Sequence, residues 1–303
     1  MSKKHLITAS AEDPRNLLLL LSQRLGWSAA QAAKAVREGA VWVDGRRVSP
    51  AVHSVVTGAR LTVFADHDPA PVAVPRVRVV YEDRELLVVC KPAGLLCQPG
   101  RRGGPSLLTV LPGPLWLPHR LDGDTSGLTM LAKSAEACAR LGQALRDGQI
   151  ERHYLARVTG VPPERGRIEL RIGKRAGPGS HSGSQSGSPR MITYPAQSQL
   201  GVSAESQFER RDTLTGPTGS QSLLLVRLAT GRTHQVRVHL AALGHPIVGD
   251  KLYGGSPFAR LGLHAATLVL VHPRTGQRLL LESELPENFW PRPLPIATEL
   301  VAP

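Results

Sequence analysis

A proline-rich segment divides this chain of 303 residues into two parts of unequal size. Residues 67–76 contain the sequence HDPAPVAVP, whose three prolines favour a stiff, extended backbone and interrupt helices and central strands. The length suits either two domains of about 150 residues or one large and one small domain. We therefore predict a small domain over residues 1–66, a linker over 67–76 and a larger domain over 77–303.

The composition is that of a globular protein with a core of its own. Apolar residues make up 41% of the chain and charged residues 20%. The apolar run Leu17–Leu21 is far shorter than the ~20 residues of a membrane-spanning helix, and the N-terminus shows no signal-peptide pattern. Cys90, Cys97 and Cys138 form no CxxC pair, which favours reduced thiols. We expect a cytoplasmic monomer without membrane contact.

The charge balance indicates a polyanionic partner. Lys and Arg number 37 against 24 for Asp and Glu, so the formal net charge is 37 − 24 = +13. A cytoplasmic protein this basic most often binds nucleic acid. The alternative is a basic surface that only keeps the protein in solution.

The small domain has the pattern of two helices followed by a hairpin. Residues 16–25 are apolar-rich, and Ser28 with Gln31 three residues later is the capping-box pattern that begins a second helix. We expect this helix to end near Glu38, before Gly39. An Asp-Gly pair at 44–45 between two extended runs predicts a tight hairpin, and residues 59–64 predict a last strand.

This helix–helix–hairpin order, with GAVWVDGRRV at its centre, resembles the small α/β RNA-binding module named after ribosomal protein S4. The resemblance implies that a basic helix face and the hairpin contact RNA. The residues in the matching positions are Arg24, Lys34, Arg37, Arg46 and Arg47. The alternative for them is a solvated surface that binds nothing.

The larger domain has the pattern of short strands interrupted by helices. Strand patterns occupy residues 77–81, 86–90, 154–159, 223–228 and 266–271. Residues 135–146 form an amphipathic helix behind the capping residue Ser134. Residues 177–189, GPGSHSGSQSGSP, are too polar to pack and predict a surface loop without chemistry.

The first segment that could carry chemistry is HRLDGDTSGL, residues 119–128. It places Asp122 after an apolar approach and a pair of basic residues. A carboxylate at the end of an extended segment, beside two basic groups, is expected to stay ionised even when it is partly buried. The alternative is an aspartate that caps the amides of Thr125 or Ser126 in a turn.

The second such segment is LATGRTHQVRVHLAALGHPIVGDKLYG, residues 228–254. We expect Thr233 to cap a helix, which places Arg237 one turn further along. His234 and His239 are five residues apart, off one helical face, and no glutamate lies between them as in the HExxH zinc motif. The pattern therefore disfavours a metal site and favours histidines that form hydrogen bonds in the core.

These two segments, with YEDRELLVVCKPAGLL (81–96), ERHYLARVTG (151–160) and GLHAATLVLVHPRTG (262–276), resemble the RluA family of pseudouridine synthases over residues 77–290. The resemblance implies an α+β catalytic domain with a mixed, mostly antiparallel sheet and flanking helices. It also implies an isomerase that converts specific uridines of ribosomal or transfer RNA into pseudouridine, with no cofactor and no metal.

The same resemblance assigns roles to five residues. Asp122 matches the essential aspartate, Tyr154 the tyrosine packed against the target base, and Arg237 the basic residue that pairs with the aspartate. Arg120 matches an arginine that enters the space left by the extruded nucleotide, and Leu263 an apolar residue that lines the uracil site. Two alternatives stay open: a non-catalytic RNA-binding or ribosome-assembly factor on this fold, and an RNA glycosylase that releases uracil.

Overall fold

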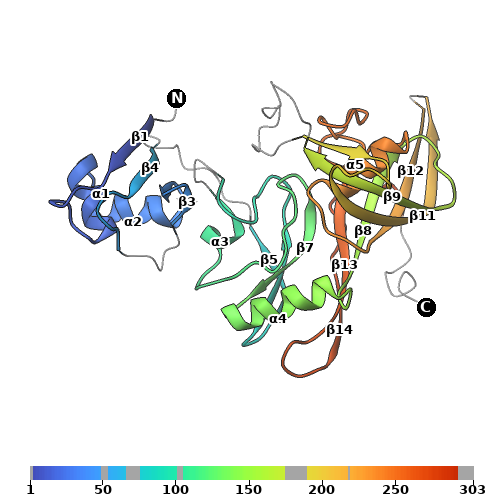
Figure 1. Cartoon of the computed structure of the whole chain (residues 1–303). Coiled ribbons are helices and arrows are strands. Elements are labelled where there is room, and N and C mark those ends of the chain that lie inside the picture. Colours follow the sequence, from blue (N-terminus) through green and yellow to red (C-terminus); the bar gives the residue numbers. More distant parts are fainter. Residues whose placement is uncertain are drawn as a thin grey trace. The chain divides into compact units, whose positions relative to one another are not determined.

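The computed structural model describes residues 3–48, 54–65, 76–100, 105–174, 190–217 and 219–292, and Figure 1 labels most of its elements. The chain forms two compact units, one of Met1–Pro75 with Leu96–Gly113 and one of Arg76–Leu95 with Pro114–Pro303. The segment 96–113, which we expected in the larger domain, groups with the N-terminal residues. The predicted loop over 177–189 and residues 67–75 of the predicted linker lie outside the described residues.

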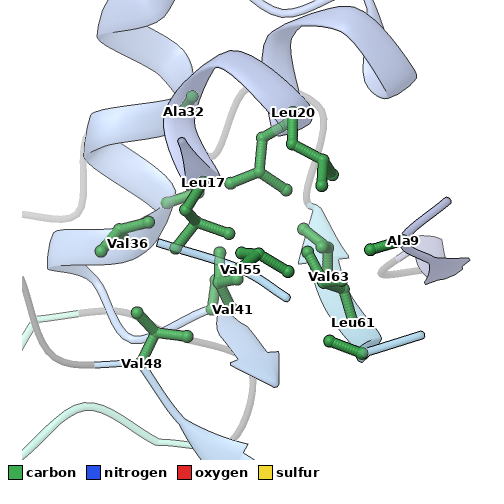
Figure 2. Packing of buried hydrophobic residues seen from close by; sticks show 14 residues of the cluster. Ala9, Leu17, Leu20, Ala32, Val36, Val41, Val48, Val55, Leu61 and Val63 are labelled. Atoms are coloured by element: carbon green, nitrogen blue, oxygen red, sulfur yellow. The ribbon is translucent and has the colours of Figure 1, made fainter. Parts of the chain in front are cut away.

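The smaller unit contains a four-stranded antiparallel sheet. Its order is β1 (Lys3–Thr8), β4 (Arg60–Ala65), β2 (Val41–Val43) and β3 (Arg46–Arg47). The helices α1 (Leu17–Leu25) and α2 (Ala29–Arg37) share an apolar core with the sheet. Figure 2 shows side chains of this core, among them Leu17, Leu20, Val41, Leu61 and Val63.

The structure contains the capping box and the hairpin that the sequence predicts in this unit. The N–H of Ser28 donates to Oε1 of Gln31 (2.8 Å) and the N–H of Gln31 donates to Oγ of Ser28 (3.2 Å), so the predicted capping box is confirmed. Asp44 and Gly45 turn the predicted hairpin with φ angles of 47° and 74°. The helix α3 (Leu107–Val110), in the segment 96–113, is a single turn.

The larger unit is built on a ten-stranded sheet of order β10-β9-β11-β12-β8-β13-β7-β6-β5, with β14 paired to β13. The strands are β5 (Arg78–Glu82), β6 (Leu86–Lys91), β7 (Ser126–Ala132), β8 (Glu151–Thr159), β9 (Arg165–Lys174), β10 (Met191–Tyr194), β11 (Val202–Gly216), β12 (Gly219–Leu228), β13 (Leu263–Val271) and β14 (Arg278–Glu282). Among the described strands of this sheet, β13 with β7 is the parallel pair and the other pairs are antiparallel. The predicted mixed, mostly antiparallel sheet is therefore confirmed.

The strand β13 changes partner along one of its edges. β8 pairs along one edge, while the other edge pairs with β7 at His264 and Ala265 and with β14 from Thr267 onward. Gly127 of β7 has a φ angle of 111°, and a Cβ at this position would overlap the backbone of Ala265. The close approach therefore requires glycine, and it brings the loop before β7 next to the centre of the sheet.

Two helices pack on this sheet. The helix α4 (Ala135–Arg146) begins at the predicted cap Ser134 and packs near β7, in a core with Met130 and Leu141. The helix α5 (Gln235–Ala242) lies against β9, β10 and β11 and buries Val238 beside Ile172 and Ala204. None of the described helices is long and apolar enough to cross a membrane.

Candidate active site

The loop that contains Asp122 is held on both sides of this residue. Before it, Nε2 of His119 accepts the N–H of Met130 on β7 (3.0 Å). After it, the carbonyl of Gly123 accepts the N–H of Gly94 and the ammonium group of Lys91, both at 2.9 Å. The turn closes through the backbone carbonyl of Asp122, which accepts the N–H of Thr125 (3.2 Å). The carboxylate itself faces other groups, and its side chain is 23% exposed.

His119 and Lys91 hold the loop in different ways, His119 as a neutral hydrogen-bond acceptor and Lys91 as a buried ammonium group that donates hydrogen bonds. Burial, together with the charge of Arg152, lowers the pKa of His119 to about 3, so the ring is neutral and Nε2 can accept a hydrogen bond. Lys91 is fully buried, and its Nζ donates to the carbonyls of Pro92 (3.0 Å), Leu95 (2.7 Å) and Gly123 (2.9 Å). A buried ammonium is stable only with such partners, so Lys91 ties the turn after β6 to the Asp122 loop.

The second loop reaches its helix differently from the prediction. Thr233 is not the capping residue: α5 begins at Gln235, and His234 occupies the cap position in the left-handed conformation, with φ 57° and ψ 19°. This conformation is uncommon for residues other than glycine and is often found at functional sites.

The side chain of Gln235 explains this geometry. Its Oε1 accepts the N–H of Arg232 (2.9 Å) and the hydroxyl of Thr230 (2.8 Å). Its Nε2 donates to the carbonyl of Glu205 (2.8 Å) and to Oγ of Ser206 (3.0 Å). These four bonds fold residues 230–234 back onto β11, and the chain then needs a sharp turn to enter α5.

Arg237 has a different main partner from the one that the family resemblance implies. Its Nε and Nη2 donate to Oδ2 and Oδ1 of Asp250 at 2.7 and 2.9 Å, and both side chains are buried. The distance from Nη1 of Arg237 to Oδ2 of Asp122 is 3.6 Å, an ion pair longer than a hydrogen bond. Burial alone would lower the pKa of Arg237, but the hydrogen bonds and charge of Asp250 outweigh it and raise the pKa.

Asp250 is the site residue that sequence reasoning missed. Besides Arg237, its Oδ1 accepts the N–H groups of Leu252 (3.0 Å) and Tyr253 (3.2 Å). Gly249 before it has a φ angle of 75°, and a Cβ there would overlap the carbonyl of Arg260. The available signal was a glycine followed directly by an acid in the motif GDKLYG, from which no role for Asp250 was predicted.

His234 is the second group that faces Asp122. Its Nε2 lies 3.9 Å from Oδ2 of Asp122, and its Nδ1 lies 2.9 Å from the hydroxyl of Tyr253. Burial lowers the pKa of His234 against the opposing effect of the Asp122 charge. The ring of Tyr253 also faces the guanidinium of Arg237, at 5.3 Å from its centroid. The carboxylate of Asp122 therefore faces the guanidinium of Arg237 and the imidazole of His234, whose side chains are both almost completely buried.

Tyr154 and Leu263 lie on one face of the central sheet, and both are buried. Directly opposed residues of an antiparallel pair point to the same face. Tyr154 opposes Ala265 and Leu263 opposes Ala156, so both side chains share that face. The register continues from Tyr154 to Val226 on β12 and from there to Phe208 on β11.

This face is the one that α5 covers. Ser206, two residues before Phe208 on β11, lies within hydrogen-bond distance of Nδ1 of His239 (3.0 Å) and Nε2 of Gln235 (3.0 Å), both on α5. Tyr154 therefore lies on the same side of the sheet as the helix of Arg237. Ala265 separates Tyr154 from Gly127 of β7, so the end of the Asp122 loop, where β7 begins, is two strand spacings, about 10 Å, from the tyrosine.

Two exposed residues flank the catalytic candidate. Arg120 is exposed and lies in neither helix nor strand, two residues before Asp122. Asp124 is exposed as well. Of the two acids in this loop, Asp122 is the one whose carboxylate lies within 4 Å of Arg237 and of His234.

The basic residues of the smaller unit fall into two groups. Arg24 donates from Nε and Nη2 to the carboxylate of Asp13, at 2.7 and 2.8 Å. Arg47 lies over the ring of Trp42, 5.2 Å from its centroid, and donates to the carbonyl of Gly100 (2.9 Å). These two arginines thus have partners inside the unit, although Arg24 is exposed. The other three predicted RNA contacts are exposed as well: Lys34, Arg37 and Arg46.

The arrangement supports chemistry by a single carboxylate. Such a group attacks or stabilises an electron-poor carbon, or accepts a proton. Glycoside hydrolysis uses a second carboxylate to activate water, but Asp250 is fully buried and holds Arg237. Within the described parts of the chain, no group of three or more His, Cys, Asp and Glu residues could hold a metal ion. The two buried histidines of α5 and its cap form hydrogen bonds, as predicted.

Comparison with known proteins adds the family context. Residues 85–242 match the RNA pseudouridylate synthase family, and residues 16–53 match the S4 domain. The chain is 34% identical over 293 residues to the ribosomal large subunit pseudouridine synthase D of Pseudomonas aeruginosa, covering 86% of this chain and 85% of that protein. It is 31% identical over 294 residues to the protein of the same description from Yersinia pestis, covering 87% and 85%.

Solved structures show the same fold. Human RNA Pseudouridylate Synthase Domain Containing 1 has a TM-score of 0.57 and 27% identity, over 72% of this chain and 87% of that one. Human RNA Pseudouridylate Synthase Domain Containing 4 has a TM-score of 0.56 and 26% identity, over 70% and 90%. Asp122, Tyr154 and Arg237 lie inside the matched range 85–242, and Asp250 lies beyond it.

Proposed function

Since this chain belongs to the RNA pseudouridylate synthase family, we propose that it converts uridines of ribosomal large-subunit RNA into pseudouridine in the cytoplasm, with Asp122 as the catalytic carboxylate. The observation that carries the proposal is the partly exposed carboxylate of Asp122, which stands 3.6 Å from the buried guanidinium of Arg237. The RNA class comes from the relatives, which are described as acting on the ribosomal large subunit.

The reaction breaks the bond between N1 of uracil and C1′ of the ribose and forms a bond between C5 and C1′. C5 loses a proton and N1 gains one, so atoms and charge balance without an oxidant, a reductant or water. This balance is why the reaction needs no cofactor. Positive charge develops at the sugar when the first bond breaks, and the carboxylate of Asp122 either stabilises that charge or adds to the carbon. The ion pair with Arg237 keeps the carboxylate aimed.

The target nucleotide must leave the RNA stack before the chemistry, at a cost of a few kcal/mol. In the proposal, Arg120 enters the space that the nucleotide leaves, since it is exposed two residues before Asp122. Tyr154 provides a rigid face for the extruded uracil, worth about 1–3 kcal/mol by stacking. Leu263, on the same face of the sheet, completes the apolar side of the site and keeps water from the detached base.

The smaller unit contributes affinity. Its residues 16–53 match the S4 domain, and Lys34, Arg37 and Arg46 are exposed on it. In the proposal these three side chains contact phosphates of the RNA, which makes binding fall steeply with salt.

The experiment that tests this function compares the wild type with Asp122→Asn. Pseudouridine is mapped in total RNA from cells whose own copy of the gene is deleted and replaced by the wild type or by Asp122→Asn. Turnover is measured in vitro by tritium release from RNA that contains [5-³H]uridine. We expect Asp122→Asn to lose ~10³-fold or more in turnover while RNA affinity stays unchanged. Tyr154→Phe is the matched variant: it keeps the ring and should lose far less activity. Near-normal turnover of Asp122→Asn would refute the role of the acid, and pseudouridines lost only from transfer RNA would refute the proposed target.

A further inference from the structure

The hydroxyl of Tyr253 determines which nitrogen of His234 carries its proton. The phenolic oxygen accepts the N–H of Met191 at 2.9 Å and lies 2.9 Å from Nδ1 of His234. Tyr253 is buried, and among the described residues no other acceptor lies within hydrogen-bond distance of its hydroxyl. A buried hydroxyl proton without an acceptor is costly, so this O–H donates to Nδ1.

An Nδ1 that accepts a hydrogen bond carries no proton. The neutral ring must then carry its proton on Nε2, the nitrogen that lies 3.9 Å from Oδ2 of Asp122. The charged and titratable groups that face the ring are Asp122, Asp124, Arg237, Asp250 and Tyr253. Burial outweighs the acids among them and lowers the pKa of His234, which agrees with a neutral ring.

We propose that His234 is a positioning residue for Asp122: Tyr253 holds its ring in the Nε2–H form, so that a neutral donor faces the carboxylate beside the charged donor Arg237. Both donors make their closest approach to the same oxygen, Oδ2. In the proposal, the other oxygen, Oδ1, is therefore left for the nucleoside. A separation of 3.9 Å is longer than a hydrogen bond, and such contacts at active sites commonly tighten when the substrate binds.

The backbone of His234 supports a dedicated role. It holds the left-handed conformation at the start of α5, which asparagine or glycine would adopt more easily. A residue needed only to begin the helix would not have to be a histidine, and a shorter side chain would not reach Asp122.

This inference rests on the proposed function, and its test separates the two. The tautomer of His234 is read by ¹⁵N NMR of the imidazole in the resting full-length protein, where the signal is assigned by its loss in His234→Asn. We expect a neutral Nε2–H ring at pH 7 in the wild type and a mixture of tautomers in Tyr253→Phe. An Nδ1–H ring or a charged ring in the wild type would overturn the proposal, whatever RNA turnover shows.

The second measurement is RNA turnover in three variants. Asparagine tolerates the left-handed backbone but is too short to reach Asp122, so His234→Asn should lower kcat about 10–100-fold with KM unchanged. His234→Gln restores an N–H donor and should recover part of the loss, and Tyr253→Phe should lower kcat about 3–10-fold. Tyr81→Phe is the matched control, since it removes a tyrosine hydroxyl that donates to Asp83. Tyr81 lies on β5, at the opposite end of the strand order from β10, whose Met191 contacts Tyr253. An unchanged kcat in His234→Asn would refute the role.

Discussion

Replacing Asp250 by asparagine keeps the shape of the side chain but removes the charge that holds Arg237. Both side chains are almost fully buried, at 0% and 4% exposure, so solvent screens their interaction little. Removing one member of a buried ion pair typically costs about 3–5 kcal/mol, because the remaining charge is left without its partner. A domain of ordinary stability, about 5–15 kcal/mol, would then stay folded but be clearly destabilised.

The same substitution should also stop the reaction. Once Asp250 is neutral, the carboxylate left within 4 Å of Arg237 is Asp122, now 3.6 Å from Nη1. We expect the guanidinium to turn toward it and to occupy the oxygen atoms that the nucleoside needs. Turnover in Asp250→Asn should therefore fall by more than its loss of folded protein explains.

Urea unfolding and turnover of Asp250→Asn, Arg237→Gln and the double variant form the assay. In the double variant two neutral amides replace the ion pair, so we expect most of the stability to return while turnover stays lost. A loss of less than about 1 kcal/mol in Asp250→Asn would contradict the ion-pair reasoning. Full activity in that variant would show that Arg237 needs no second carboxylate.

Two further predictions concern pH and salt. Burial is the main reason that the pKa of three histidines is lowered to about 3 to 4 in the folded protein: His119, His239 and His264. Below pH 6.5 the unfolded chain takes up protons at these residues and the folded chain does not, so the free energy of unfolding falls as the pH drops below that value. Each should cost about 2 kcal/mol between pH 7 and pH 5, and urea unfolding that is unchanged over this range would refute the assignment. For RNA binding, neutral replacements of Lys34, Arg37 and Arg46 should reduce the slope of log K against log salt by about 2–3. The same change at Arg165 and Arg167, which pair with glutamates, is the control, and an equal effect there would contradict a specific contact.

Much of the fold could be predicted because its signals are local. The cap Ser134, the helix behind it and the five strand patterns predicted in the larger domain are found, although β8, β12 and β13 extend further than predicted. β1, β9, β10, β11 and β14 escaped prediction. β9 alternates charged and apolar residues over residues 167–172, a strand signal that the predictions did not use. β11 lacks this signal, because the buried positions 204, 206 and 208 hold Ala, Ser and Phe, and its pairing with β9 and β12 rather than its own composition makes it a strand.

The candidate site shows the same division. Asp122, its turn and the likeness to a known family were legible in the sequence, because they depend on residue types in a fixed order. The main partner of Arg237 could not be predicted, because the sequence offers two acids, Asp122 and Asp250. Only the fold places Asp250 at 2.7 Å and Asp122 at 3.6 Å from the guanidinium. The left-handed start of α5 likewise depends on bonds from Gln235 to Glu205 and Ser206 on a distant strand. Order along a chain sets what short-range contacts can form, whereas distances between remote groups exist only after the chain has packed.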